Sequence, residues 1–304
     1  MLETLRPFQL FFLSAGIAIA GSIVFGAQHN WLFLSCCVVV LAAGLPHGAF
    51  DIYIIANLFQ NKSFALAILV YLSLIVITVL VWWINPQAFL TLFLTYSAFH
   101  FGDSDCPTET ISYKASWGLS IIALPCLLAT EEVALLFSVI LDAEPLPIIA
   151  NGLSYSALPA VLFCCLKATK QNTRFTTCAL LSCYALVCLI GGALIAFSCY
   201  FAFLHGPHHL RRWRLKIPNS PNMGVYLISL ALFAGIALLT VLAPEINLSN
   251  INGPSNNLSN NLSNNLSNGL VNALDANAIR YTFVALAALT VPHMTFLYIA
   301  SRRN

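Results

Sequence analysis

The chain has 304 residues, of which 59% are hydrophobic and only 8% are charged. An ordinary soluble domain carries about 25% charged residues, so this composition is typical of an integral membrane protein and leaves no room for a soluble catalytic domain. The net charge of +2 is small, and the basic residues lie in short clusters beside apolar runs, where they direct topology. We therefore expect no nucleic-acid partner.

Apolar runs of about 20 residues, the length that crosses a bilayer, follow one another along the chain. They predict an all-α fold, a polytopic transmembrane bundle of about 8–10 spans that forms one integral-membrane domain over residues 1–304. The expected helices cover residues 8–27, 31–57, 64–84, 86–103, 113–130, 152–169, 180–210, 221–243 and 278–300.

Two stretches between these runs are less regular. The segment 131–151 contains acidic residues and prolines, and it is either a tenth span or an interfacial segment. Residues 247–269 form a low-complexity insertion of Asn, Ser and Leu, which cannot bury a core and reads as a flexible loop.

Clusters of Lys and Arg indicate the orientation in the membrane. The heaviest clusters, residues 211–216 and 302–303, are separated by two expected spans, so both can lie in the cytoplasm. Counting back through ten spans also places Arg6 and Lys62 inside, but it places Lys167, Lys170 and Arg174 on the outer side, against the rule. We expect a multi-pass protein of the cell's inner (plasma) membrane, surrounded by membrane lipid.

Five of the seven histidines recur at one depth of the expected spans. At about 1.5 Å per residue, their positions place all five imidazoles in the cytoplasmic half of the membrane. Ionisable groups at membrane depth are costly, so several at one level indicate a shared site inside the bundle. The five residues are His47, His100, His205, His209 and His293.

The spacing of His205 and His209 suits two ligands of one metal ion, because residues i and i+4 lie on the same face of a helix. His208 points about 100° away from His209 and is a weaker candidate. Neutral imidazole favours zinc, copper, iron or nickel. A metal centre of this kind would need carboxylates nearby to balance its charge.

Carboxylates follow two of the other histidines. Asp51 comes four residues after His47, and Asp103 and Asp105 follow His100. These three side chains are expected as acceptors for the ring N–H that faces away from the metal, which would hold each imidazole in one tautomer.

Several metal chemistries remain open from the residues alone. The pattern of residues 205–209 has the HxxHH form of membrane desaturases, but their di-iron sites use about eight histidines, and this chain has seven. A haem- or metal-binding membrane electron carrier needs only four histidines, and a transporter could use a histidine relay. Both stand as alternatives to an enzyme.

The histidines lie in four short motifs, which are GLPHGAFD at residues 44–51, SAFHFGDSD at 97–105, HGPHH at 205–209 and TVPHM at 290–294. Together these motifs resemble the Brp/Blh family of membrane β-carotene 15,15'-dioxygenases. The resemblance implies that the domain is catalytic and that a ferrous ion, Fe(2+), is held by His47, His100, His205 and His209. His293 matches the last motif and is expected close to the ligands.

The resemblance also implies a reaction and its partners. O2 would cleave the central C15=C15' double bond of β-carotene, giving two molecules of all-trans retinal. A polyene dissolved in the bilayer could enter between helices, and the retinal could be delivered to a microbial rhodopsin. Among the aromatic residues beside the motifs, Tyr96, Phe99 and Phe203 are expected to line the substrate path.

Overall fold

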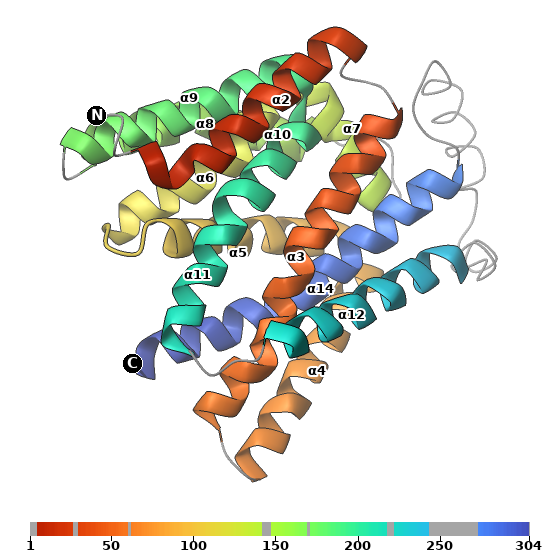
Figure 1. Ribbon diagram of the computed structural model, residues 1–304. Helices are drawn as coiled ribbons and strands as arrows, with labels where there is room; N and C mark the ends of the chain where they lie inside the picture. The colour runs from red at the N-terminus through yellow and green to blue at the C-terminus, as the bar shows by residue number, and fades with distance from the viewer. Residues whose placement is uncertain are drawn as a thin grey trace.

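A computed structural model of the protein describes residues 5–26, 30–59, 62–141, 147–168, 171–217, 222–242 and 273–303. Within these ranges the regular structure is entirely helical, which confirms the prediction of an all-α bundle (Figure 1). Six of the described helices are long and apolar enough to cross a membrane. The Asn-rich insertion at 247–269 lies outside the described residues.

The elements follow one another with short connections. The first half of the chain forms a 3-10 turn (Arg6–Phe8), α2 (Gln9–Phe25), α3 (Asn30–Leu58), α4 (Lys62–Ile84), α5 (Pro86–Asp105), α6 (Ile111–Leu128) and α7 (Thr130–Leu141). The second half forms α8 (Pro147–Lys167), α9 (Gln171–Gly191), α10 (Ala193–Tyr200), the π-helical turn η2 (Phe201–His205), α11 (Gly206–Lys216), α12 (Asn222–Leu242) and α14 (Ala273–Arg303).

The prediction of one helix over residues 180–210 is wrong, because the chain breaks between α9 and α10 at Gly192. This glycine has φ +91°, a left-handed conformation that other residues rarely adopt. The new helix is capped by the Glu132 carboxylate, which accepts hydrogen bonds from the backbone N–H groups of Ala193 at 2.8 Å and Leu194 at 3.1 Å. The Gly-Gly pair at this point was the available sequence signal for the break.

The segment 131–151 is not a tenth span. It contains α7, which has 12 residues and is therefore about 18 Å long, too short for a hydrocarbon core of about 30 Å. Helix α8 then begins at Pro147, five residues before the predicted start at 152. An additional helix comes instead from the division of the predicted 180–210 helix into α9 and α10.

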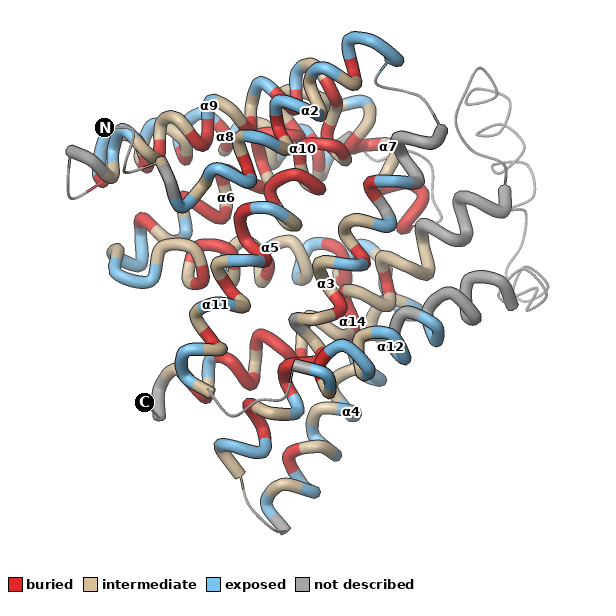
Figure 2. Tube along the Cα trace, in the orientation of Figure 1, coloured by how far each residue is buried: buried red, intermediate tan, exposed pale blue. Residues whose placement is uncertain are grey.

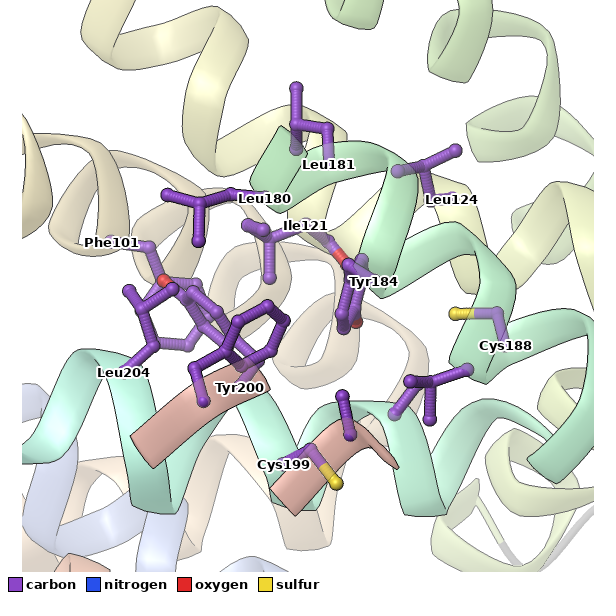
Figure 3. Packing of buried hydrophobic residues seen from close by; sticks show 14 of the residues in the cluster. Phe101, Ile121, Leu124, Leu180, Leu181, Tyr184, Cys188, Cys199, Tyr200 and Leu204 are labelled. Atoms are coloured by element: carbon purple, nitrogen blue, oxygen red, sulfur yellow. The ribbon is translucent and has the colours of Figure 1, made fainter. Parts of the chain in front are cut away.

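Buried apolar side chains of the described residues form five clusters, and two of them adjoin the histidines. The larger cluster joins α2, α6, α8, α9 and α10, and includes Tyr184 and Tyr200, whose rings lie 5.9 Å apart (Figure 3). A smaller cluster joins α3, α11, α12 and α14 around Trp213 and Phe50. Figure 2 shows buried positions along the inner helices, whereas α4 is mostly exposed or half-buried, as suits a helix that faces lipid.

Helices α5 and α6 approach each other closely through two glycines. A Cβ atom added to Gly102 would overlap the backbone carbonyl of Lys114, and one added to Gly118 would overlap that of Ala98. Small residues of this kind let helix backbones come together inside a membrane. The contact holds the C-terminal end of α5, with its histidine and acidic residues, against the larger apolar cluster.

Basic helix ends lie toward one side of the bundle. The end of α8, the start of α9, the end of α11 and the end of α14 all lie toward the left in Figure 1. The membrane side on which Lys167 and Arg174 lie stays a prediction.

Candidate metal centre

Three imidazoles from three different elements meet inside the bundle. His100 comes from α5, His205 from the last residue of η2 and His209 from α11. One nitrogen of each ring lies within 4.8 Å of one nitrogen of each of the others. The ring centroids are 5.2 Å apart for His100 and His205, 5.4 Å for His100 and His209, and 5.7 Å for His205 and His209.

A wider helical turn precedes this group. The Gly206 N–H donates to the carbonyl of Phe201, five residues back, as in a π-helix. Pro207 has no N–H and so cannot bond to the carbonyl four residues before it, which favours such a local change of register. The turn stacks the His205 ring on Phe201, with centroids 5.7 Å apart. The proline inside the expected helix was the sequence signal for it, and π-bulges are frequent at functional sites.

The ring of His205 is oriented by Asp105. Its Nδ1–H donates to Asp105 Oδ1 at 2.8 Å, and the two side chains are only 1% and 3% exposed. The other carboxylate oxygen, Oδ2, accepts from the hydroxyl of Tyr200 at 2.6 Å and from the indole N–H of Trp117 at 3.1 Å. This arrangement of imidazole, carboxylate and outer donor is the one that fixes the tautomer of a metal-binding histidine.

His209 has a different partner. Its Nδ1 forms a 2.9 Å hydrogen bond with the hydroxyl of Ser104, which lies on α5 between the two acidic residues of that helix. With Nδ1 engaged in both His205 and His209, Nε2 is the nitrogen left to face the centre of the group. Ser104 was not singled out in the sequence, because a serine near a helix end is a common residue with many possible roles.

A fourth imidazole, that of His293 on α14, adjoins the group. Its ring centroid lies 5.1 Å from that of His209 and 5.6 Å from that of His100. Its Nδ1 bonds to Asp51 Oδ1 at 2.6 Å, and the Tyr71 hydroxyl donates to Asp51 Oδ2 at 2.8 Å. Asp51 of α3 therefore contacts a histidine 242 residues away in the sequence. The side chain of His47 lies outside the described residues.

Two other polar residues named from the sequence lie at the edge of the group. The Asp103 carboxylate pairs with Lys114 Nζ at 2.7 Å and is 39% exposed, while its backbone carbonyl accepts from Arg212. His208 faces away from the other histidines, with its ring 5.0 Å from that of Phe8 and its Nε2 3.4 Å from the carbonyl of Pro7.

A cavity of about 320 Å³ opens beside His100 and His209. Besides the two histidines, its polar lining residues are Asp103, Ser104, Arg212 and Ser301. The aromatic and apolar lining residues are Tyr96, Phe99, Trp213, Met294, Leu297 and Tyr298. Tyr96 and Phe99 thus lie where a substrate path was expected, whereas Phe203 is not among the lining residues and is 37% exposed.

The donor set fits a single transition-metal ion. Three neutral imidazole nitrogens are ligands that iron, zinc, copper and nickel accept, and the buried carboxylates of Asp105 and Asp51 can balance the charge of a divalent ion through the rings they contact. A haem held by two histidines would need its macrocycle between the rings. Here the rings pack against one another, which disfavours that alternative.

Comparison with known proteins agrees with the motifs. A family model described as "Beta-carotene 15,15'-dioxygenase" matches residues 38–299. A protein named "Beta-carotene 15,15'-dioxygenase" from uncultured marine bacterium 66A03 is 27% identical over 281 residues, which cover 88% of this chain and 92% of that protein. No solved structure matches the chain.

Proposed function

Because the chain belongs to the β-carotene 15,15'-dioxygenase family, we propose that it cleaves the central C15=C15' double bond of β-carotene with O2 and releases two molecules of all-trans retinal. The observation that carries this proposal is the group of three histidines beside a cavity with aromatic and apolar walls. An apolar polyene needs such walls, and a reaction with O2 needs a redox-active metal close to them.

The proposed cofactor is Fe(2+), with His100, His205 and His209 as ligands and His47 as a further ligand implied by its motif. A bound ferrous ion would supply the activation of O2 that the side chains alone do not provide. The protein's own contribution is to keep the ligand rings oriented. Asp105 does so for His205 and Ser104 for His209, each by a hydrogen bond to Nδ1.

The cavity provides for the substrate. Phe99, Trp213, Met294 and Leu297 offer apolar surface to a polyene, and they exclude water from the side of His100 and His209. Tyr96 is held by a 3.1 Å hydrogen bond between its hydroxyl and that of Thr295, so its ring has a defined place in the wall. These residues would determine which double bond lies beside the metal.

The proposed location is the cell's inner membrane. The side that carries the basic residues of α11 would face the cytoplasm, following the positive-inside rule. The substrate is dissolved in the same bilayer, and retinal released there could reach a microbial rhodopsin without entering water.

Retinal production in cells that accumulate β-carotene tests the proposal. We expect retinal, measured by chromatography, from the parent and none from His100→Ala or His209→Ala. His208→Ala is the matched control, because it removes the neighbouring imidazole, which faces Phe8; it should produce retinal as the parent does.

Two outcomes would contradict the proposal. If the folded, iron-loaded parent leaves β-carotene intact and the purified protein shows a Soret band, the chain is a haem-binding electron carrier. If it moves protons or solutes across sealed vesicles and cleaves nothing, it is a transporter that uses its histidines as a relay.

A further inference from the structure

We propose that His293 is a direct ligand of the same metal ion, contributed by α14 as an imidazole in addition to those of His100, His205 and His209. The proposal rests on the proposed function only in requiring that the three-histidine group binds iron. It would make the metal a link between the cluster that contains Tyr200 and the one that contains Trp213, because α14 contributes Leu297 and Ala300 to the latter.

The position of His293 is the first argument. Its ring contacts those of His100 and His209 at centroid distances of 5.6 and 5.1 Å, which fall close to the 5.2–5.7 Å spacings within the three-histidine group. His205 contacts the same two rings. His205 and His293 therefore flank one pair of imidazoles. The nitrogens that lie within 4.8 Å of one another are those of His100, His205 and His209, so the proposal requires the His293 ring to move toward them when an ion binds.

The second argument is that His293 repeats the hydrogen bonding of His205. In both residues Nδ1 bonds to a buried aspartate, at 2.8 Å for Asp105 and 2.6 Å for Asp51. In both cases the second carboxylate oxygen accepts from a tyrosine hydroxyl, at 2.6 Å for Tyr200 and 2.8 Å for Tyr71. The four partners come from four different elements, so local sequence does not produce the repetition.

The chemistry of this arrangement favours a ligand. A neutral imidazole whose Nδ1–H donates to a carboxylate has its lone pair on Nε2, and this is the tautomer that binds a metal through Nε2. The carboxylate also makes Nε2 a stronger electron-pair donor to the metal. Asp51 is only 2% exposed, and a buried carboxylate at membrane depth is costly. A divalent ion held through the His293 ring would offset that cost.

Ferrous iron itself is the probe for the test. The purified protein in detergent is titrated with Fe(2+) without oxygen, bound iron is measured by elemental analysis, and the nitric oxide adduct is recorded by electron paramagnetic resonance. The parent is compared with His293→Ala, His293→Gln and Tyr71→Phe. Val284→Ala is the control, because it opens a cavity at another buried position of α14.

The expected result is a graded loss of iron. Loss of a residue that only hydrogen-bonds to a ligand lowers metal affinity roughly 10–100-fold. We therefore expect the decrease in iron affinity to lie within or below this range for Tyr71→Phe. For His293→Ala we expect a larger decrease. His293→Ala should recover iron when free imidazole is added, and X-ray absorption should count one imidazole fewer per iron without it. Val284→Ala should keep the affinity and spectrum of the parent.

Other outcomes would overturn the inference. If His293→Ala binds iron with the affinity, spectrum and imidazole count of the parent, His293 only ties α14 to α3. If His293→Ala aggregates, His293→Gln and Tyr71→Phe provide the test. Iron affinity equal to that of the parent in both variants would show that His293 is not a metal ligand. A parent that binds no iron would instead contradict the proposed function, so the two failures are distinguishable.

Discussion

Two aspartates occupy similar places on opposite sides of the histidine group, and their surroundings differ. Asp105 lies against the larger apolar cluster and is bound by three groups, the imidazole of His205, the hydroxyl of Tyr200 and the indole of Trp117. Asp51 lies beside the smaller cluster, and the structure gives its carboxylate two partners, His293 and Tyr71.

The difference indicates how each side is held in place. On the Asp105 side, Tyr200 and Trp117 are 1% and 3% exposed, and α5 and α6 are in close backbone contact. On the Asp51 side, Tyr71 is half-buried on α4, the helix that faces lipid. We infer that the Asp105 side forms the rigid half of the site, while the Asp51 side can adjust when an ion binds.

Gly102 offers the strongest way to disturb the Asp105 side alone. In Gly102→Ala the new methyl group would meet the Lys114 carbonyl, so α5 and α6 must separate. We expect the free energy of unfolding to decrease by about 1–3 kcal/mol or more, because an overpacked contact costs this amount. A backbone carbonyl, unlike a side chain, cannot rotate away from the new methyl group. Thermal unfolding in detergent, with the yield of monodisperse protein, measures it.

Gly48 provides the matched substitution on the Asp51 side. Nothing lies within 4 Å of a Cβ built on this residue of α3. Gly48→Ala should therefore leave the unfolding midpoint unchanged or raise it by the equivalent of about 0.5–1 kcal/mol, the usual gain in a helix. Equal destabilisation by the two substitutions would contradict the assignment of the close contact to α5 and α6.

The two aspartates can then be compared directly. Asp105→Asn and Asp51→Asn each remove the charge that orients one imidazole, and we expect iron affinity to fall roughly 10–100-fold in each. The loss should be larger for Asp105→Asn, because its three partners are all disturbed. Anaerobic iron titration measures both, and a larger loss in Asp51→Asn would reverse the order of rigidity inferred above.

Removal of one phenol hydroxyl on each side should have a smaller effect. Tyr200→Phe leaves a buried carboxylate without one donor, and hydrogen bonds to charged groups contribute about 1.5–3 kcal/mol. We expect a destabilisation in this range for Tyr200→Phe and a lower value for Tyr71→Phe, whose surroundings are less buried. The unfolding midpoints of the two variants decide between this order and an equal effect.

The weakest effect is expected at Lys114. Its 2.7 Å ion pair with Asp103 is partly open to solvent, with the aspartate 39% exposed, and exposed pairs contribute about 0–1 kcal/mol. Lys114→Met should therefore change the unfolding midpoint little and leave iron affinity as in the parent. A loss of iron in this variant would show that Asp103 acts on the histidine group after all.

Much of the architecture could be predicted because hydrophobic runs depend only on neighbouring residues. The all-α bundle and the boundaries of α2, α3, α4 and α5 follow from run length and from prolines. The break at Gly192 was missed because the residues on both sides of it are apolar. The Gly191-Gly192 pair was a sequence signal, but a glycine pair is also common inside membrane helices. The contact of Glu132 with the start of α10 decides that the chain turns there.

The histidines were also identifiable from the sequence, because an ionisable residue inside an apolar run is conspicuous. Their partners were not. Asp51 stands four residues after His47, yet its carboxylate bonds to His293, and Asp105 follows His100 but orients His205. Sequence spacing defines neighbours on one helix, whereas these hydrogen bonds join different helices. Which helices meet depends on side-chain packing over the whole bundle, including the glycine contact between α5 and α6, and no local pattern contains that information.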